Sequence, residues 1–199
     1  MTGGAGLLLI ISGPSGVGKT TITHEVQKRV EGAELSVSVT TRPQTAADRV
    51  GVHYNFIDEA EFLGMIDRDE LLEHAEVFGN RYGTPRKWVE ERLASGGVVI
   101  LEIDVQGAVQ VKRAMPGAFG VFILPPSEES LLQRLRDRKR EDEATIQRRF
   151  REAKREIAAA QAGGVYDEFV VNRDLGEAIE RTVELVEQAR LARAGGSAG

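Results

Sequence analysis

The segment GPSGVGKT, residues 13–20, matches the nucleotide-binding pattern G-x-x-x-x-G-K-[ST]. Its glycines let the backbone approach a polyphosphate without Cβ clashes, and its N–H groups face an anion together with the start of the next helix. Lys19 of such a loop reaches the β- and γ-phosphates, and the Thr20 hydroxyl can ligate Mg²⁺. The pattern predicts a triphosphate-binding phosphate loop at Gly13, Pro14, Ser15, Gly16, Val17, Gly18, Lys19, Thr20 and Thr21. GTPases, ATPase motors and small-molecule kinases all remain open at this point.

Four further segments follow the phosphate loop: SVSVTTR at 36–42, GVHYNF at 51–56, ELLEHAEVFGNRYGTPR at 70–86 and LEIDVQGA at 101–108. In this order and spacing they resemble the guanylate kinase family, whose members phosphorylate GMP with ATP. The resemblance extends from about residue 7 to residue 186. The family pattern E-x-A-x-[VF]-x-G-x-x-Y-G-T is matched by Glu73, Ala75, Val77, Gly79, Tyr82, Gly83 and Thr84. The resemblance implies an ATP:GMP phosphotransferase with Mg²⁺ as cofactor, and dGMP as a further acceptor.

A carboxylate suits guanine because the N1–H group and the N2 amino group both donate from one edge of the base. Adenine has an acceptor at N1, which would leave the carboxylate lone pairs unpaired, and unpaired buried groups can support discrimination on the order of 10⁴. The resemblance gives this role to Glu73, a contact with the guanine to Thr84, and a place nearby to Asp104. Taken alone, Glu73 would be interpreted as a solvated carboxylate; the full motif favours the guanine-binding role.

The acceptor phosphate requires cations and hydroxyl groups, because an Arg holds two phosphate oxygens in a fork and a Tyr hydroxyl adds a directed donor. The resemblance implies that GMP phosphate is bound by Arg42, Tyr54 and Tyr82, with Ser38 close by. One segment departs from the family: Thr45 stands where a second phosphate-binding Arg is usual, and Ala47-Asp48 replaces Gly-Glu. Arg49 is close enough in sequence to substitute from another angle. The departure leaves open a kinase for another phosphorylated small molecule, which the Glu73 and Thr84 pattern opposes.

A basic cluster occupies LLQRLRDRKRED at 131–142, and two more arginines lie in IQRRF at 146–150. The charges alone favour a solvated helical face. The resemblance implies instead a lid whose arginines stabilise the charge on the transferred phosphoryl group. The catalytic residues that it implies are Lys19, Arg42, Arg134, Arg138 and Arg149. Where the family often has Arg-Gly-Thr-Glu, this chain has RKRED, so Lys139 and Arg140 add positive charge and remove a flexible glycine.

No general base is predicted, because the attacking group is a phosphate oxygen of GMP that is already largely ionised at neutral pH. Catalysis then consists of positioning and charge stabilisation. Asn172, in the run VVN, matches a family position beside the adenine, and a strand-end or turn Asn is the alternative interpretation. The three histidines have no pattern of partners that suggests a metal site or a base.

The phosphate loop requires a buried strand before it and an amphipathic helix after it, and the sequence predicts both. LLLIIS at 7–12 is apolar on both faces, as a central parallel strand requires, and Ile22, Val26 and Val30 recur every four residues in a helix from about Lys19 to Val30. Other strands are predicted at 35–39, 98–104, 119–124 and 168–172, with loops and short strands at 40–56 and a turn at 79–86. Other helices are predicted at 58–67, from Pro85 to Gly96, from a Ser127 cap through Leu135, along Ile146 to Ile157, and along Ile179 to Val186.

Strands that alternate with helices predict a parallel sheet covered on both faces, and only the segment 35–84 breaks the alternation. The predicted fold is therefore α/β: a three-layer P-loop NTPase fold with a central parallel sheet, an inserted GMP-binding region and a helical lid. The expected parts are a core of residues 1–34, 85–126 and 157–199, a GMP-binding region at 35–84, a lid at 127–156 and a disordered tail at 194–199. The lid and the GMP-binding region are expected to close toward each other.

The chain of 199 residues has a net charge of −5 and no cysteine, which excludes disulfides and thiolate catalysis. The acidic balance argues against a nonspecific nucleic-acid partner. No apolar run approaches the roughly 20 residues that span a membrane, and the N-terminus lacks a basic n-region, so a soluble cytoplasmic protein is expected. Its oligomeric state is not indicated. A noncatalytic peptide-binding module is a further alternative, but such guanylate-kinase-like domains typically lose the functional phosphate loop, which is intact here.

Overall fold

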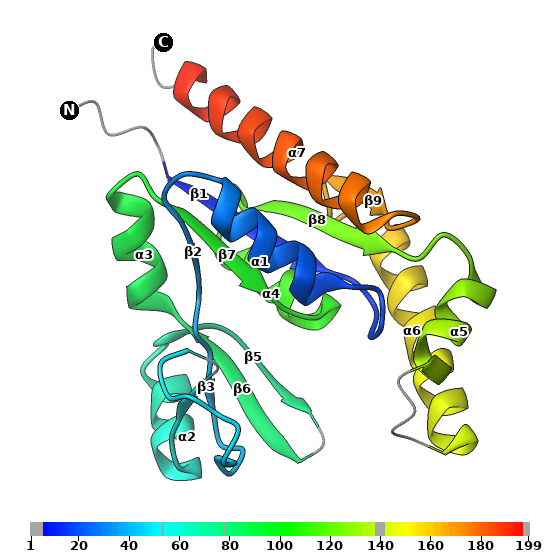
Figure 1. The fold of residues 1–199 in the computed structure, drawn as a ribbon. Coiled ribbons are helices and arrows are strands. Elements are labelled where there is room, and N and C mark those ends of the chain that lie inside the picture. The colour runs from blue at the N-terminus through cyan, green and yellow to red at the C-terminus, as the bar shows by residue number, and fades with distance from the viewer. Residues whose placement is uncertain (1–5, 53, 78, 138–141, 197–199) are drawn as a thin grey trace.

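The computed structural model describes residues 6–52, 54–77, 79–137 and 142–196. Its main sheet, sheet A, has five parallel strands in the order β2-β7-β1-β8-β9 (Figure 1). These strands are β1 (Leu7–Ser12), β2 (Ala33–Leu35), β7 (Val98–Glu102), β8 (Phe119–Leu124) and β9 (Glu168–Val171). Because helices cover both faces of this sheet, the predicted α/β architecture with a central parallel sheet is confirmed.

Alternate residues of β1 contribute to two separate cores. Leu7, Leu9 and Ile11 pack on the face covered by α1 (Lys19–Arg29) and α7 (Leu175–Gly196), which lie together on one side of the sheet (Figure 1). Leu8 and Ile10 pack on the other face with residues of α3 (Arg86–Ala94), α4 (Val105–Ala114) and α6 (Glu143–Ala162). Burial on both faces explains why the strand has no polar alternation. The phosphate loop begins directly after this buried strand, at Gly13.

A second, smaller sheet, sheet B, has the strand order β4-β3-β6-β5 and lies beside sheet A (Figure 1). Its strands are β3 (Val39–Thr40), β4 (Asn55–Phe56), β5 (Leu71–Val77) and β6 (Asn80–Pro85). Helix α2 (Glu59–Asp67) packs on sheet B through Phe62, which forms a small core with Val39 and Leu71. The segment that breaks the strand–helix alternation therefore builds a sheet with a core of its own.

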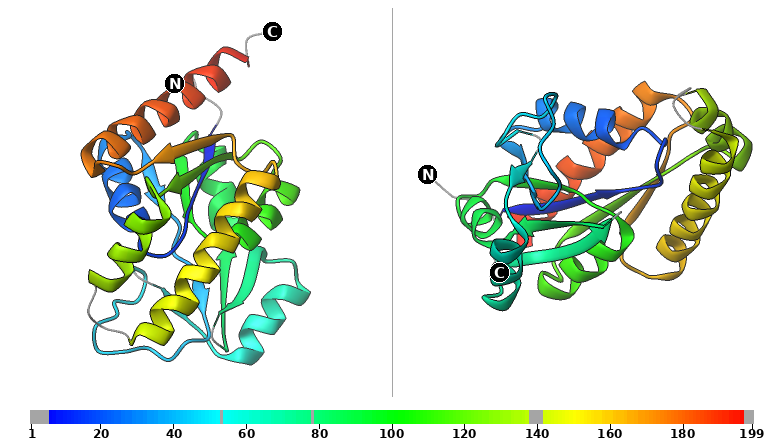
Figure 2. Two further views of the ribbon diagram at one scale, coloured as in Figure 1. Left: turned by 90° about the vertical axis from the view of Figure 1, so that its right-hand side faces the viewer. Right: turned by 90° about the horizontal axis from the view of Figure 1, so that it is seen from below.

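Helix α5 (Glu128–Asp137) pairs with α6 at one end of sheet A (Figure 2). Ser127 caps α5 as predicted, since its Oγ accepts a hydrogen bond from Ser130 N at 3.2 Å. The predicted lid residues Arg138, Lys139 and Arg140 lie outside the described residues. Within the part of the chain that the structure describes, no helix combines the length and the apolar composition needed to cross a membrane.

Three predicted elements differ from the structure. The single strand predicted at 35–39 is wrong, because the chain leaves sheet A after Leu35 and joins sheet B at Val39. The turn predicted at 79–86 is wrong for Asn80–Pro85, which form β6. The disordered tail is wrong at its start, because α7 continues to Gly196; residues 197–199 lie outside the described residues.

Candidate active site

The phosphate loop connects β1, the central strand of sheet A, to α1. Gly13, Gly16 and Gly18 have φ angles of 153°, 90° and 97°, which residues with a Cβ rarely adopt. A Cβ on Gly18 would in addition meet Asn172 Nδ2 at 2.8 Å. Lys19 Nζ donates to the Gly13 carbonyl at 2.5 Å, so the ammonium group lies along the loop. The loop thus has the backbone freedom and the cation that polyphosphate binding requires.

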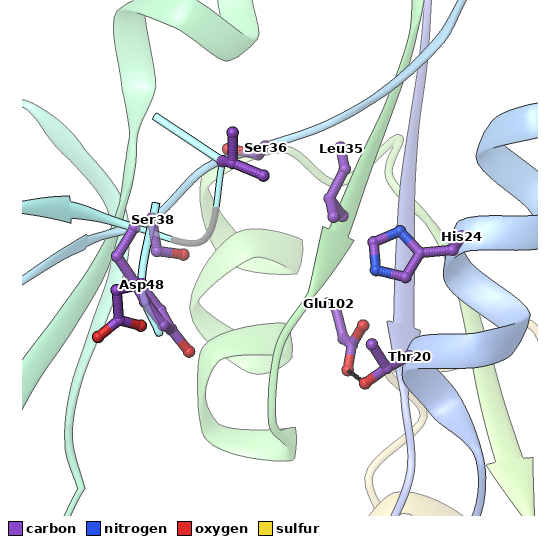
Figure 3. Close-up of a pocket in the computed structure, with 9 residues that line it drawn as sticks. Thr20, His24, Leu35, Ser36, Ser38, Asp48 and Glu102 are labelled. Carbon is purple, nitrogen blue, oxygen red and sulfur yellow. Dashed lines mark hydrogen bonds between the residues drawn. The ribbon is translucent and has the colours of Figure 1, made fainter. Parts of the chain in front are cut away.

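A hydrogen bond joins α1 to the neighbouring strand at the foot of this loop. Thr20 Oγ1 donates to Glu102 Oε1 at 2.8 Å (Figure 3), while Thr21 is exposed on α1. Glu102 is the last residue of β7, which pairs with β1. Glu102 is absent from the predicted site residues, although VVILE, an apolar run that ends in an acid, carries a signal for it.

A hydroxyl and a carboxylate are hard oxygen ligands of the kind that Mg²⁺ prefers, so Thr20 and Glu102 fit this metal. No group of three or more His, Asp or Glu side chains suited to a metal ion occurs among the described residues. Since Mg²⁺ usually takes one or two carboxylates together with substrate phosphates, this sparse donor set is the expected one.

Two adjoining cavities lie next to the phosphate loop and sheet B. The larger, of about 300 Å³, is lined by Thr20, His24, Leu35, Ser36, Ser38, Asp48, Val52, Tyr54 and Glu102 (Figure 3). The smaller, of about 160 Å³, is lined by Ser38, Tyr54, Glu73, Ala75, Val77, Tyr82, Glu102, Ile103 and Asp104. Ser38, Tyr54 and Glu102 contribute to both. The structure therefore brings five of the predicted acceptor residues, Ser38, Tyr54, Glu73, Tyr82 and Asp104, to one cavity.

Glu73 is a buried carboxyl group on β5, with only 6% of its surface exposed. Its Oε1 accepts a hydrogen bond from Thr84 Oγ1 on the neighbouring strand β6 at 2.6 Å. Burial raises the pKa of Glu73 to about 7; the Asp104 carboxylate adds to this rise, and the Thr84 hydrogen bond opposes it. A Cβ on Gly107 would meet Glu73 Oε2 at 2.8 Å, so α4 leaves room for the carboxylate at this point.

Arg42 lies among aromatic rings at the start of the loop between β3 and β4. Its guanidinium carbon is 5.3 Å from the ring centroid of Tyr54 and 5.4 Å from that of Phe56. Tyr54 meets Tyr82 edge-on, with ring centroids 5.6 Å apart. The Arg42 Nη1 and Nη2 atoms donate to the two oxygens of Asp48 at 3.0 and 2.8 Å. The three residues predicted to bind the acceptor phosphate therefore lie together, with Asp48 as an additional, acidic neighbour.

Of the predicted lid arginines, Arg149 contacts the phosphate loop and Arg134 contacts Asn172, which is itself bonded to the loop. Arg149 on α6 donates to Ser15 Oγ. Arg134 on α5 donates through Nη2 to the Asn172 carbonyl at 2.9 Å. The Asn172 side chain is 3% exposed, and its Nδ2 donates to the Val17 carbonyl at 2.7 Å. Asn172 thus stabilises the phosphate loop through this hydrogen bond. Its predicted contact with adenine stays a prediction.

The family model described as guanylate kinase matches residues 6–189 of this sequence. The chain belongs to the guanylate kinase family. A guanylate kinase from Thermobifida fusca is 48% identical over 179 residues, which cover 90% of each chain. One from Myxococcus xanthus is 45% identical over 190 residues, which cover 94% of this chain and 90% of the relative. A crystal structure of guanylate kinase from Anaplasma phagocytophilum superposes with a TM-score of 0.72 at 35% identity, over 98% of this chain and 89% of the other.

Membership of the guanylate kinase family confirms the resemblance inferred from the four downstream segments, and with it the predicted enzyme class of ATP:GMP phosphotransferase. The matched range includes the phosphate loop and every residue that lines the two cavities. It also includes Thr45 and Asp48.

Proposed function

We propose that this chain transfers the γ-phosphate of ATP to GMP, and also to dGMP, and so releases ADP and the nucleoside diphosphate in purine nucleotide metabolism. One observation carries the proposal: Glu73, buried and hydrogen-bonded to Thr84, lines a cavity that shares Ser38, Tyr54 and Glu102 with the cavity beside the phosphate loop. A base recognised at Glu73 and a triphosphate held at residues 13–21 would then occupy the two ends of one site.

On the acceptor side, we assign the guanine to Glu73 and Thr84, with Asp104 nearby. A carboxylate offers about four lone-pair positions, so Glu73 can keep the Thr84 hydrogen bond and still accept both the N1–H and N2 donors of guanine. We assign the phosphate of GMP to Arg42, Tyr54 and Tyr82, with Ser38 close by. The Arg42 guanidinium carbon is 5.3 Å from the Tyr54 ring centroid, which is 5.6 Å from that of Tyr82, and this proximity supports a shared ligand.

On the donor side, we assign the triphosphate of ATP to residues 13–21. Thr20 and Glu102 would hold Mg²⁺, which when bound supplies positive charge to the terminal phosphates. We assign the adenine end to Asn172, whose buried Oδ1 has no hydrogen-bond partner among the described residues and is an acceptor suited to an amino group.

In the transfer step, an oxygen of the acceptor phosphate bonds to the γ-phosphorus of ATP as the bond from that phosphorus to the ADP oxygen breaks. Lys19 and the lid arginines Arg134 and Arg149 would neutralise the charge that spreads over the transferred phosphoryl group. We assign the same role to Arg138. The chain needs no base for this step, since the acceptor phosphate is ionised. Closure of residues 127–156 over residues 35–84 would exclude water, which would otherwise hydrolyse ATP.

A coupled spectrophotometric assay of ADP formation tests the proposal. With Mg-ATP, we expect rapid turnover of GMP and dGMP and turnover of AMP, CMP and UMP that is lower by orders of magnitude. Lys19→Ala should abolish turnover, whereas Lys28→Ala, at an exposed position later in α1, should retain it. Turnover of AMP equal to that of GMP would refute the role of Glu73. A folded protein with no turnover of any nucleotide would favour a noncatalytic binding module.

A further inference from the structure

The Arg42 guanidinium is already engaged by an acid of the same chain. Its Nη1 and Nη2 atoms form a two-pronged hydrogen bond with Asp48 Oδ2 and Oδ1, at 3.0 and 2.8 Å. The side chains of Arg42 and Asp48 are 25% and 11% exposed, so the pair is largely shielded from water. Within the described residues, Asp48 lines the larger cavity beside Ser38 and Tyr54 (Figure 3). A carboxylate thus lines the cavity to which Ser38 and Tyr54, two residues that we assign to the acceptor phosphate, also contribute.

Thr45 holds Asp48 in this position. The backbone N–H and the Oγ1 hydroxyl of Thr45 both donate to Asp48 Oδ2, at 2.8 and 2.7 Å. With the Arg42 Nη1 contact, this one oxygen accepts three hydrogen bonds from described residues. The hydroxyl comes from the residue that replaces a second phosphate-binding Arg. The substitution therefore removes a cation from the site and at the same time fastens an acid onto the remaining one.

A phosphate group and a carboxylate use the same fork of an Arg, because both present two oxygens at the spacing of its two terminal nitrogens. A phosphate that approaches Arg42 while Asp48 is bound meets a pair with no net charge and a carboxylate that repels it. We propose that Asp48, fastened by Thr45, competes with the acceptor phosphate for Arg42 and thereby sets how tightly the acceptor is bound. This inference rests on the proposed function, because it takes GMP as the ligand.

Two variants test the competition. Asp48→Asn keeps the size of the side chain but removes its charge, so we expect the KM for GMP to fall about tenfold with kcat and the KM for ATP little changed. Thr45→Val keeps the carboxylate and removes one of the hydrogen bonds that Asp48 Oδ2 accepts, so we expect a smaller fall in the KM for GMP, of about twofold to threefold. If Asp48→Asn does not fold, as judged by circular dichroism, Thr45→Val carries the same comparison.

Guanosine, which has no phosphate, separates this effect from a general change in the site. Its affinity, measured by calorimetry, should stay within twofold in both variants. Glu59→Gln is the matched control, because it removes a charge from the same region, where Glu59 pairs with Arg81 at 2.8 Å, and should leave the KM for GMP unchanged.

A raised KM for GMP in Asp48→Asn would overturn the inference, because it would mean that Asp48 orients Arg42 and leaves the Nε side of the guanidinium to the phosphate. An unchanged KM, or a matching change for guanosine, would overturn it as well. These outcomes are distinct from failure of the proposed function, in which the unaltered chain itself would not phosphorylate GMP.

Discussion

Replacing Glu73 with Gln removes the carboxylate that we assign to guanine and keeps the size of the side chain. In the structure, Glu73 Oε1 accepts a hydrogen bond from Thr84 at 2.6 Å, and Oε2 lies 2.8 Å from the position that a Cβ on Gly107 would take. The amide of Gln has one oxygen, which would accept the hydrogen bond from the Thr84 hydroxyl. The NH₂ group of the amide would then face the base. That group faces the N1–H and N2 donors of guanine, so two attractive contacts become a repulsive one.

We expect Glu73→Gln to lower kcat/KM for GMP about 10³-fold, because each hydrogen bond to a charged group contributes about 1.5–3 kcal/mol. The loss for AMP should be much smaller, since the N1 acceptor of adenine can pair with the amide, so discrimination between the bases narrows. Glu76→Gln makes the same change at an exposed position of the same strand and serves as the control.

The pKa of the same carboxyl provides a second test. Burial raises it from 4.5 to about 7, and this difference corresponds to about 3 kcal/mol. Because the folded-state pKa is the higher one, the stability that this group contributes is complete below pH 4.5 and is lost as the pH rises through about 7. Guanine binding has the opposite dependence, because only the ionised carboxylate accepts both donors.

The affinity for guanosine should therefore fall about tenfold for each pH unit below about 7. Guanosine is the suitable ligand, because the phosphate of GMP itself titrates near pH 6, as phosphate monoesters do. Calorimetric titration between about pH 5.5 and 8 measures this affinity in the unaltered chain and in Glu73→Gln. An affinity of the unaltered chain that does not change with pH would refute the reasoning, as would a variant that keeps GMP turnover within threefold.

Three further predictions concern the donor side and the loop after β3. Thr20→Val removes the hydroxyl that bonds to Glu102 and should raise the Mg²⁺ concentration for half-maximal activity about tenfold in a metal titration; an unchanged titration would exclude Thr20 as a ligand. Asn172→Ala removes the hydrogen bond to the Val17 carbonyl and should lower the melting temperature by several degrees. It should also raise the KM for ATP but not the KM for GMP. An equal rise in the two KM values would contradict the contact between Asn172 and the phosphate loop. Thr45→Arg should lower the KM for GMP with unchanged base specificity, and an unchanged or raised KM would count against it.

The sequence was most informative where burial determines the structure. The runs LLLIIS and FGVFIL, which carry no charged residue, predict strands buried on both faces, and β1 and β8 lie there with no exposed residue. The phosphate loop follows from its glycines, three of which have the left-handed φ angles that the motif requires. In these places, local composition and tertiary packing favour the same conformation.

Sheet B was predicted poorly because β3 and β4 have only two residues each and because the composition of β6 points to a turn. Gly83 and Pro85 suggest a turn, yet Gly83 pairs with His74 on one side and Val39 on the other. A Cβ on Gly83 would lie 2.8 Å from Leu71 Cδ1 and 3.2 Å from the Glu73 carbonyl oxygen, so a side chain here would force a neighbour to shift. Contacts between strands distant in sequence override the local preference here.

The candidate site shows the same division. The motif identifies Glu73, but the sequence alone cannot give its burial or its raised pKa, which arise from packing between β5, β6 and α4. Nor can it give the Arg42–Asp48 pair, because the residue types at 42 and 48 do not determine whether the loop folds back. Glu102 has a sequence signal, but its importance depends on its contact with Thr20.

The central claim is that one site holds the donor triphosphate at the phosphate loop and the guanine nucleotide at Glu73. Following the fate of a labelled γ-phosphate tests it most directly, by ³¹P NMR of a stoichiometric mixture of Mg-ATP and GMP with the chain. We predict that ADP and GDP appear in equal amounts and that the label is found in the β-phosphate of GDP. Release of the label as inorganic phosphate, with GMP unchanged, would contradict the claim.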